Sequence, residues 1–201
     1  MNIMSKRLFD IFFSFSGLLI IWPILLFLAI LIKRDSPGPV FYRGVRVGRQ
    51  GKEFKIFKFR TMVENAEKLG GPSTAGDDPR LTKIGNFLKK YQLDELPQLI
   101  NVLRDEMSLA GPRPEVKMYV DMMAEEERKI ILSIKPGMTD LASLWNFHES
   151  EVLKGSLDPE KTYMEKIRPE KIRLQLEYVK NRSFMLDLRI VIKTILKVFY
   201  G

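Results

Sequence analysis

The chain has 201 residues, 45% of them hydrophobic and 29% charged, which excludes both an intrinsically disordered chain and a polytopic membrane protein. Lys and Arg number 33 against 25 Asp and Glu, and the net charge of +8 favours a negatively charged partner: nucleic acid, an anionic lipid surface or a phosphorylated substrate. Cysteine is absent and His148 is the sole histidine, which excludes disulfides, thiolate metal sites and cysteine nucleophiles and argues against a histidine triad.

The N-terminal segment has the composition of a membrane anchor. From Ile11 to Ile32 the chain carries no charged residue, and about 20 apolar residues suffice for a spanning helix. Basic pairs flank it on both sides, Lys6-Arg7 and Lys33-Arg34, and such flanks favour the cytoplasmic side. Pro23 interrupts the middle, where it bends a helix. These features favour a re-entrant helix that enters one leaflet and returns, with a proline-kinked single span as the alternative.

The remaining residues predict a mostly helical α/β unit with a short β-hairpin. The anchor ends at residue 34, because turn-forming residues follow, so we expect an anchor of residues 1–34 and a second domain of residues 35–201. Segments 40–42 and 53–60 predict the two strands of the hairpin. Helical periodicity and composition predict helices over 82–91, 94–103, 115–132, 159–179 and 186–200.

The hairpin and the last helix both carry clustered basic residues. Between positions 43 and 60, Glu53 is the one acidic residue among seven basic ones, a pattern typical of a face toward anionic lipid or of a phosphate cradle that includes Lys58 and Arg60. On the last helix, Arg189, Lys193 and Lys197 form a single basic stripe on an apolar cylinder. This favours an amphipathic helix at the membrane interface over a core helix.

Asp94-Glu95 is a pair of carboxylates at the start of an expected helix. Acidic residues stabilise helix N-termini, so a purely structural role is one interpretation. In a basic protein the same pair could hold Mg²⁺, and a carboxylate can attack phosphorus covalently. Asp94 and Glu95 are therefore candidate catalytic residues and candidate metal ligands.

Arg113 lies in a rigid turn between Pro112 and Pro114. A guanidinium held in one direction suits bidentate recognition of phosphate, although a surface turn with an incidental Arg has the same sequence. Arg80 and Lys58 are candidate companions in phosphate binding.

Taken in order, these segments resemble the bacterial sugar transferases, the monotopic phosphoglycosyl transferases. The resemblance covers residues 5 to 198 and rests on segments in this order and spacing. They are Lys6-Arg7, the proline-interrupted anchor, KIFKFRTM (55–62), DPR (78–80), LDELPQL (93–99), MSLAGPRP (107–114), PGMT (136–139) and NRSFMLD (181–187).

The resemblance implies a chemistry and a location. Such enzymes transfer a sugar-1-phosphate from a UDP-sugar to undecaprenyl phosphate, release UMP and require magnesium (Mg²⁺). Asp94 matches the family's nucleophile, which forms a phosphosugar-aspartate, and Glu95 matches its partner. The implied fold is a compact catalytic domain with interfacial helices on the cytoplasmic face of the bacterial inner membrane.

One stretch departs from the commonest family pattern. Residues 140–149 read DLASLWNFHE where many relatives carry a Gly-rich continuation, and this leaves the identity of the sugar open. The alternative to an enzyme is a membrane-tethered basic module that binds an anionic polymer or nucleic acid. We expect a lipid membrane, a UDP-sugar and undecaprenyl phosphate as partners and no nucleic acid; the sequence leaves homodimer formation open.

Overall fold

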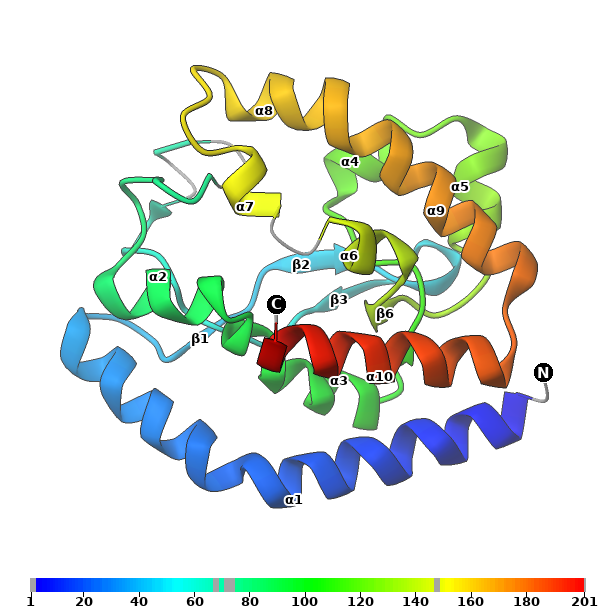
Figure 1. Cartoon of the computed structure of the whole chain (residues 1–201), viewed down its shortest axis with the longest axis horizontal. Coiled ribbons are helices and arrows are strands. Elements are labelled where there is room, and N and C mark those ends of the chain that lie inside the picture. Colours follow the sequence, from blue (N-terminus) through cyan, green and yellow to red (C-terminus); the bar gives the residue numbers. More distant parts are fainter. Residues whose placement is uncertain (1–2, 67–68, 71–74, 147–148, 201) are drawn as a thin grey trace.

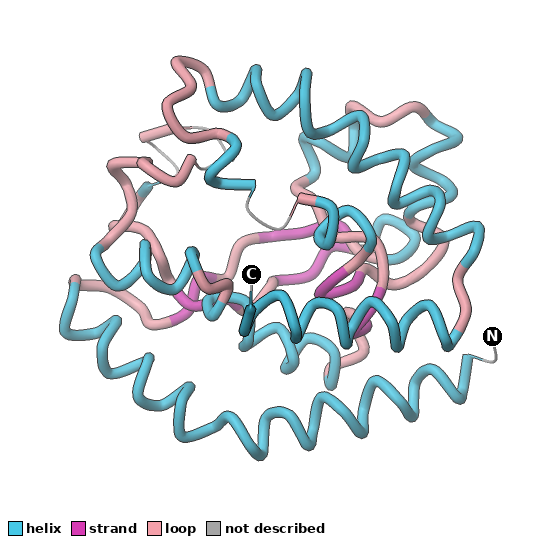
Figure 2. The backbone as a smooth tube through the Cα atoms, in the orientation of Figure 1, coloured by secondary structure: helices cyan, strands magenta, loops and turns pink. Residues whose placement is uncertain are grey.

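Helices dominate the fold, and short strands lie between them (Figures 1 and 2). The computed structural model describes residues 3–66, 69–70, 75–146 and 149–200. Its helices are α1 (Ile3–Asp35), α2 (Lys83–Lys90), α3 (Leu99–Leu103), α4 (Lys117–Asp121), α5 (Glu125–Ile131), α6 (Leu141–Trp145), α7 (Glu149–Val152), α8 (Pro159–Thr162), α9 (Arg168–Asn181) and α10 (Phe184–Tyr200). Its strands are β1 (Phe41–Tyr42), β2 (Val45–Val47), β3 (Glu53–Lys55), β4 (Lys58–Phe59), β5 (Ser108–Ala110) and β6 (Gly137–Thr139). The expected class, mostly helical with a few short strands, is confirmed.

A hairpin is present as predicted, but its first arm continues through β2, beyond the predicted strand 40–42, and the ladder is interrupted between its two strand pairs. Strand β2 pairs with β3 and β1 pairs with β4, both antiparallel. Between the two pairs the Ile56 N–H donates to the Gly44 carbonyl, 3.0 Å away. The next amide, Phe57 N–H, turns instead to the side-chain oxygen of Asn101, at 2.8 Å. This contact with α3 interrupts the ladder and ties the hairpin to the helix behind it.

The helix predictions are correct in position but miss internal breaks. Helix α2 begins after Thr82, whose hydroxyl accepts a hydrogen bond from the Gly85 N–H at 2.9 Å. The helix expected over 94–103 starts as a tighter 3₁₀ turn, η3 (Leu93–Gln98), and becomes α-helical only from Leu99. Pro97 lies within η3 and has no N–H to donate, which favours this change of winding.

Two other predicted helices are subdivided. The stretch 115–132 forms α4 and α5 with a break between them. The stretch 159–179 runs from α8 through a π-helical turn, η4 (Tyr163–Ile167), into α9. Pro169 lies in the first turn of α9, where a proline is tolerated because that turn's N–H groups have no helical acceptor.

The parallel pair β5–β6 was not predicted, because both strands lie next to turn motifs. Ser108 pairs with Gly137 and Ala110 with Thr139. A Cβ added to Gly137 would lie 2.1 Å from the Gly111 nitrogen, so the two backbones approach too closely for any side chain. This pair sets the position of the Gly-Pro-Arg-Pro turn that follows β5.

Helix α1 is long and apolar enough to cross a membrane over Met4–Asp35. Figure 1 shows it as a bent rod along one side of the molecule, with Pro23 inside it. Its large apolar side chains are mostly exposed, among them Ile20 at 75% and Phe27 at 60%. A helix with such a surface needs an apolar environment, which supports membrane association.

A buried polar cluster fastens the beginning of α1 to the C-terminal part of the chain. The Lys6 ammonium pairs with the carboxylate of Asp187, which is 1% exposed, and also donates to the Ala110 carbonyl. The Tyr178 hydroxyl donates to Asp187 at 2.6 Å and lies 3.0 Å from the same carbonyl. Four segments, α1, β5, α9 and α10, therefore meet at one carboxylate.

The basic residues at both ends of α1 contact the domain beside it. The Arg7 guanidinium donates to the Val102 and Leu103 carbonyls at the end of α3, at 2.6 and 2.9 Å. At the far end, the Asp35 carboxylate accepts from the Ile84 N–H at 3.1 Å, while Ile32 is buried in a core cluster. Both ends of the anchor thus lie against the same globular unit.

Helix α10 has the composition expected of an amphipathic helix. Ile190 is buried, whereas Ile192, Ile195 and Leu196 are about half exposed. At its first residue, Phe184 lies edge-on to Phe9 of α1, with 5.2 Å between ring centroids. The apolar surface of α10 therefore starts beside that of the anchor; its place at a membrane interface stays a prediction.

We expect Tyr178→Phe to destabilise the protein, because it removes a hydroxyl that serves Asp187 and leaves the buried carboxylate with one partner fewer. The loss should be about 1–3 kcal/mol, the usual penalty for a buried polar group deprived of a hydrogen bond. Unfolding in lipid nanodiscs, followed by tryptophan fluorescence, measures it. Tyr91→Phe is the matched control, since Tyr91 is 43% exposed. Equal stability of the two variants would contradict a structural role for the cluster.

Candidate active site

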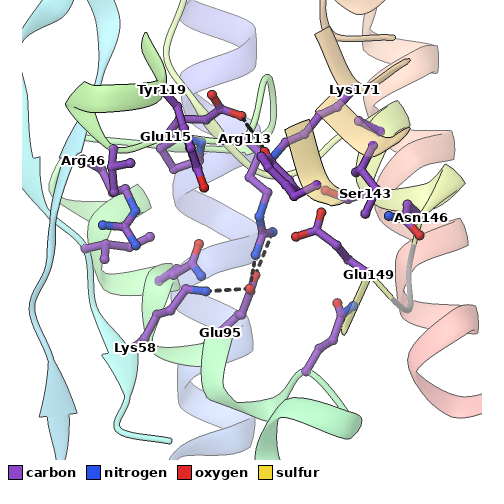
Figure 3. A pocket seen from close by; sticks show the side chains of 18 of the residues that line it. Arg46, Lys58, Glu95, Arg113, Glu115, Tyr119, Ser143, Asn146, Glu149 and Lys171 are labelled. Carbon is purple, nitrogen blue, oxygen red and sulfur yellow. Dashed lines mark hydrogen bonds and ion pairs between the residues drawn. The ribbon is translucent and has the colours of Figure 1, made fainter. Parts of the chain in front are cut away.

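A cavity of about 240 Å³ lies where η3, the Gly-Pro-Arg-Pro turn, α6 and α9 meet. Figure 3 shows Lys58 and Glu95 at one end of it, Glu115 and Tyr119 at the other, and Arg113 reaching between them. Both predicted catalytic carboxylates, Asp94 and Glu95, line the wall. The predicted phosphate-binding residues Lys58 and Arg113 line it too.

Two cations hold Glu95. Arg113 approaches it with both terminal nitrogens, one hydrogen bond being 3.0 Å long, and Lys58 donates to the same carboxylate at 2.7 Å. Burial opposes ionisation of Glu95, but the charges of Arg113 and Lys58 outweigh it and hold its pKa well below the usual range. Glu95 is therefore an anion with a fixed orientation.

Asp94 has a different environment from its neighbour. Its carboxylate is buried, and the Lys58 ammonium is 3.9 Å away. Burial raises the pKa of Asp94 to about 6; the charge of Glu95 acts in the same direction and that of Lys58 opposes it. The two adjacent carboxylates thus differ strongly in basicity, a pattern typical of sites where one acid performs chemistry and the other supports it.

Asp94 is not a helix cap. The capping position before η3 belongs to Gln92, whose backbone is left-handed with φ of 55°. Asp94 lies within the first turn, as does Glu95. The left-handed residue turns the chain sharply just before the acid pair, and a non-glycine residue in that conformation is uncommon and strained.

Lys89 is a cavity residue that the sequence did not identify. It comes from the last turn of α2 and faces the same cavity as Asp94. Burial lowers the pKa of Lys89 to about 8, against the opposing charge of Asp94. With Lys58 and Arg113 it surrounds the acid pair with positive charge, an arrangement that attracts phosphate.

The backbone fixes the direction of Arg113. The close contact of Gly111 and Gly137 continues the β5–β6 pair, with the Gly137 N–H donating to the Pro112 carbonyl at 2.9 Å. The Arg113 N–H donates to the Asp140 carboxylate at 3.2 Å, and the other oxygen of Asp140 caps α6. The role of Asp140 was missed, although an Asp three residues before Ser143 is a recognisable cap signature.

Two predicted phosphate ligands lie elsewhere. Among the described residues, the cavity wall includes neither Arg60 nor Arg80. The Arg60 guanidinium is directed at carbonyls at the end of α1, among them that of Ser36 at 2.8 Å. Arg80 pairs with Asp78 at 2.7 Å and donates to the Ala66 carbonyl. Both contacts organise backbone, so the structure does not bring these residues to Asp94.

The three prolines that were expected near the site lie in different parts of the structure. Pro114 lines the cavity, Pro112 supports the strand pair behind it, and Pro23 belongs to the anchor and lies apart from the site. Of the divergent stretch 140–149, Ser143, Asn146 and Glu149 line the cavity, and His148 is outside the described residues. The stretch that departs from the commonest family pattern therefore forms part of the cavity wall.

The acid pair suits a metal ion that is bound partly by protein and partly by substrate. It suits an ion bound by protein side chains alone less well. No group of three or more acidic or histidine side chains gathers around a common point within the described residues. The oxygens of Glu95 already accept from Arg113 and Lys58, which leaves Asp94 as the freer donor. Mg²⁺ is commonly held by one or two carboxylates plus substrate phosphates, and these residues match that pattern.

Comparison with known proteins decides the family. The model of the bacterial sugar transferase family matches residues 1–201. The chain belongs to this family. The sugar transferase is 39% identical to an exopolysaccharide production protein of Rhizobium leguminosarum bv. phaseoli, over 97% of this chain and 95% of that protein.

Two further relatives carry more specific names. A UDP-glucose:undecaprenyl-phosphate glucose-1-phosphate transferase of Escherichia coli is 37% identical over 98% of this chain and 41% of its own length. A UDP-N-acetylgalactosamine-undecaprenyl-phosphate N-acetylgalactosaminephosphotransferase of Aeromonas hydrophila is 36% identical over 98% of this chain and 44% of its own. The chain thus spans less than half of these two proteins. The expectation of an enzyme, a phosphoglycosyl transferase, is confirmed, and the family decides against a binding module.

We expect Arg113→Lys to lower turnover of the sugar transferase by about tenfold or more while the melting temperature changes little. Lysine keeps the charge but loses the planar fork that grips Glu95 and suits phosphate. Steady-state kinetics and thermal unfolding of the same preparation measure the two effects. Arg173→Lys is the control, because Arg173 pairs with Glu170 and Glu177 on the outer surface of α9. A parallel fall in melting temperature and activity would make Arg113 a structural residue.

Proposed function

We propose that this sugar transferase moves a sugar-1-phosphate from a UDP-sugar to undecaprenyl phosphate and releases UMP, an early membrane step in the assembly of a polysaccharide or other glycoconjugate. The observation that carries the proposal is the acid pair: a carboxylate of raised pKa beside one clamped by two cations, in a cavity lined by further positive charge. The names of the relatives support the substrate class.

In the proposed first step, the Asp94 carboxylate attacks the sugar-bearing phosphorus of the donor. A bond forms between an Asp94 oxygen and that phosphorus, the bond to the UMP oxygen breaks, and UMP leaves with the electron pair. In the second step, an oxygen of the lipid phosphate attacks the same phosphorus and the Asp94 carboxylate is restored. One cavity serves both substrates in turn, because the nucleotide leaves before the lipid phosphate enters.

The basic residues of the site reduce the repulsion between the anionic nucleophile and its anionic substrates. An anionic nucleophile must meet two anionic substrates, and two like charges about 4 Å apart repel by about 4 kcal/mol at an effective dielectric constant of 20. Lys58, Lys89 and Arg113 supply opposing charge in the proposed site. Glu95 positions Lys58 and Arg113 through its two contacts. When bound, Mg²⁺ would be held by Asp94, Glu95 and substrate phosphate, and would neutralise charge on the diphosphate.

The anchor is proposed to be re-entrant, with both ends and the catalytic domain on the cytoplasmic face of the inner membrane. Lys6 and Arg7 at one end and Asp35 at the other all contact the globular unit, which supports placing both ends on one side. The exposed apolar surface between them would lie in one leaflet. This keeps the cavity near the depth of lipid phosphates, where the acceptor reacts.

We expect Asp94→Asn to abolish transfer, because a carboxamide is not a useful nucleophile toward phosphorus. Wild-type protein incubated with Mg²⁺ and labelled UDP-sugar, without lipid, should retain label and release UMP in equal amount. Intact-mass measurement and peptide mapping should place the label on Asp94. Near wild-type transfer by Asp94→Asn would instead favour direct displacement by the lipid phosphate, whereas label at another residue would make that residue the nucleophile.

Glu95→Gln provides a matched comparison for the covalent step. It keeps the size of the side chain but removes the charge that holds Arg113 and Lys58, so we expect turnover to fall by about a hundredfold or more. Unlike Asp94→Asn, this variant should still accumulate label slowly, because the nucleophile is intact. Wild-type label that maps to Glu95 and is absent from Glu95→Gln would assign the covalent bond to Glu95.

For the anchor, single cysteines at Ser5 and Ser36 should both resist a membrane-impermeant thiol reagent in intact cells and react once the cells are permeabilised. The chain contains no other cysteine, so each signal reports one position. A re-entrant helix leaves both ends in the cytoplasm, whereas a single span exposes one of them outside. Labelling of Ser5→Cys in intact cells would therefore show that α1 crosses the membrane.

A further inference from the structure

A second polar cluster lies at the end of the cavity away from the acid pair. The Lys171 ammonium, on α9, is 3.1 Å from the Glu115 carboxylate and 2.9 Å from the Tyr163 hydroxyl. Figure 3 shows Glu115, Tyr119 and Lys171 across the cavity from Lys58 and Glu95. All of these residues line the cavity. None of them has a part in the proposed phosphoryl transfer.

Glu115 has hydrogen-bonding capacity that the described residues do not use. Its side chain is 4% exposed, one carboxylate oxygen contacts Lys171, and the other, Oε2, is buried without a hydrogen-bond partner among the described residues. A buried charged oxygen left unpaired is costly. In a residue that lines a cavity, this favours an acceptor reserved for a ligand that brings its own O–H or N–H.

Other walls of the cavity show the same feature. The amide nitrogen of Gln98 and the hydroxyl of Ser143 are also buried and lack a partner within the described part of the chain. Together with Glu115 they offer acceptors and donors in different directions. Hydroxyl groups both donate and accept, so a polyhydroxyl ring matches this set better than a purely anionic or apolar group.

We propose that Glu115, with Lys171 and Tyr163, binds the sugar ring of the donor and determines which sugar is transferred. The inference rests on the proposed two-step function. Between the steps the sugar stays attached through its phosphate to Asp94 while UMP departs. The sugar therefore requires the enclosed end of the cavity, near Glu115 and Tyr163, and the nucleotide requires an end that opens to solvent. Tyr163 and Glu115 are 3% and 6% exposed. Trp145, on another wall of the same cavity, is 48% exposed and offers a flat aromatic surface to the departing base.

Packing alone does not account for the cluster. The stacked rings of Tyr119 and Tyr163 and the buried Leu153 already form an apolar core there. A buried ion pair is often no more stabilising than apolar residues of similar size. A Glu–Lys pair that lines a cavity and has one buried oxygen without a partner among the described residues is therefore better explained by recognition than by stability.

The test uses full-length protein in lipid nanodiscs with Mg²⁺ and undecaprenyl phosphate. Wild type is assayed first for UMP release from UDP-glucose, UDP-galactose, UDP-N-acetylglucosamine and UDP-N-acetylgalactosamine. UMP release from none of them would refute the proposed function itself. With an active donor known, the same panel is run on Glu115→Gln, and inhibition by UMP is measured on each protein.

For Glu115→Gln we expect KM for the preferred donor to rise about tenfold or more, and the ratio of kcat/KM between donors to change by at least about fivefold. The inhibition constant of UMP should stay within about twofold of wild type, because UMP lacks the sugar. Glu165→Gln, an exposed carboxylate on η4 that is 61% accessible, should match wild type in every measurement. A rise in the inhibition constant of UMP as large as the rise in KM for the donor would make the cluster a nucleotide site and overturn the proposal.

Tyr163→Phe covers the case in which Glu115→Gln does not fold. It keeps the stacked ring and removes only the hydroxyl that Lys171 contacts. We expect the same shift in donor preference, smaller in size, at about threefold. Unchanged donor ratios in the folded variants, with a lowered melting temperature, would make the cluster purely structural and refute its role in sugar recognition.

Discussion

The clamp on Glu95 is the contact on which the rest of the site depends. It joins three segments far apart in sequence: β4 through Lys58, η3 through Glu95, and the turn after β5 through Arg113. Removing the charge of Glu95 would leave Lys58 and Arg113 without their shared anion, which is unfavourable in a low-dielectric environment. Burial raises the pKa of Asp94, and the charge of the clamped Glu95 acts in the same direction, so Asp94 is the carboxylate of higher pKa.

Polar contacts between segments far apart in sequence also hold the anchor against the globular unit. Charged and main-chain groups meet at both ends of α1, and the apolar surface between them stays exposed. Basic residues that flank a hydrophobic segment are usually interpreted as topology signals. Lys6 and Arg7 here also have specific acceptors, an Asp carboxylate and the carbonyls that end α3. One short motif can therefore serve membrane orientation and tertiary structure together.

The sequence predicted features that depend on local composition. The apolar anchor, the hairpin and the positions of most helices follow from periodicity and turn chemistry. It did not predict β5–β6, because a parallel pair joins strands remote in sequence and each strand here is only three residues long.

The sequence also predicted those site residues that lie in recognisable local motifs. Asp94, Glu95 and Arg113 lie in short motifs that stand out by residue type, and Lys58 lies in a basic run. Lys89 and Lys171 come from helices whose sequence is ordinary, and Glu115 comes from the loop before α4. Only the packing of these segments brings the three residues to one cavity. Arg60 and Arg80 show the opposite case, since a basic residue near a motif can be occupied entirely by backbone carbonyls or a neighbouring acid.

The ion pair between Lys6 and Asp187 also constrains how the protein is made. The two residues are 181 positions apart, so the contact closes a loop of nearly the whole chain. During synthesis the Lys6 side chain leaves the ribosome 181 residues ahead of its acidic partner. The contact that holds the start of α1 against the globular unit therefore cannot form until Asp187 has been made. A fragment that starts at residue 35 would lack Lys6, and Asp187 would keep Tyr178 without its cation.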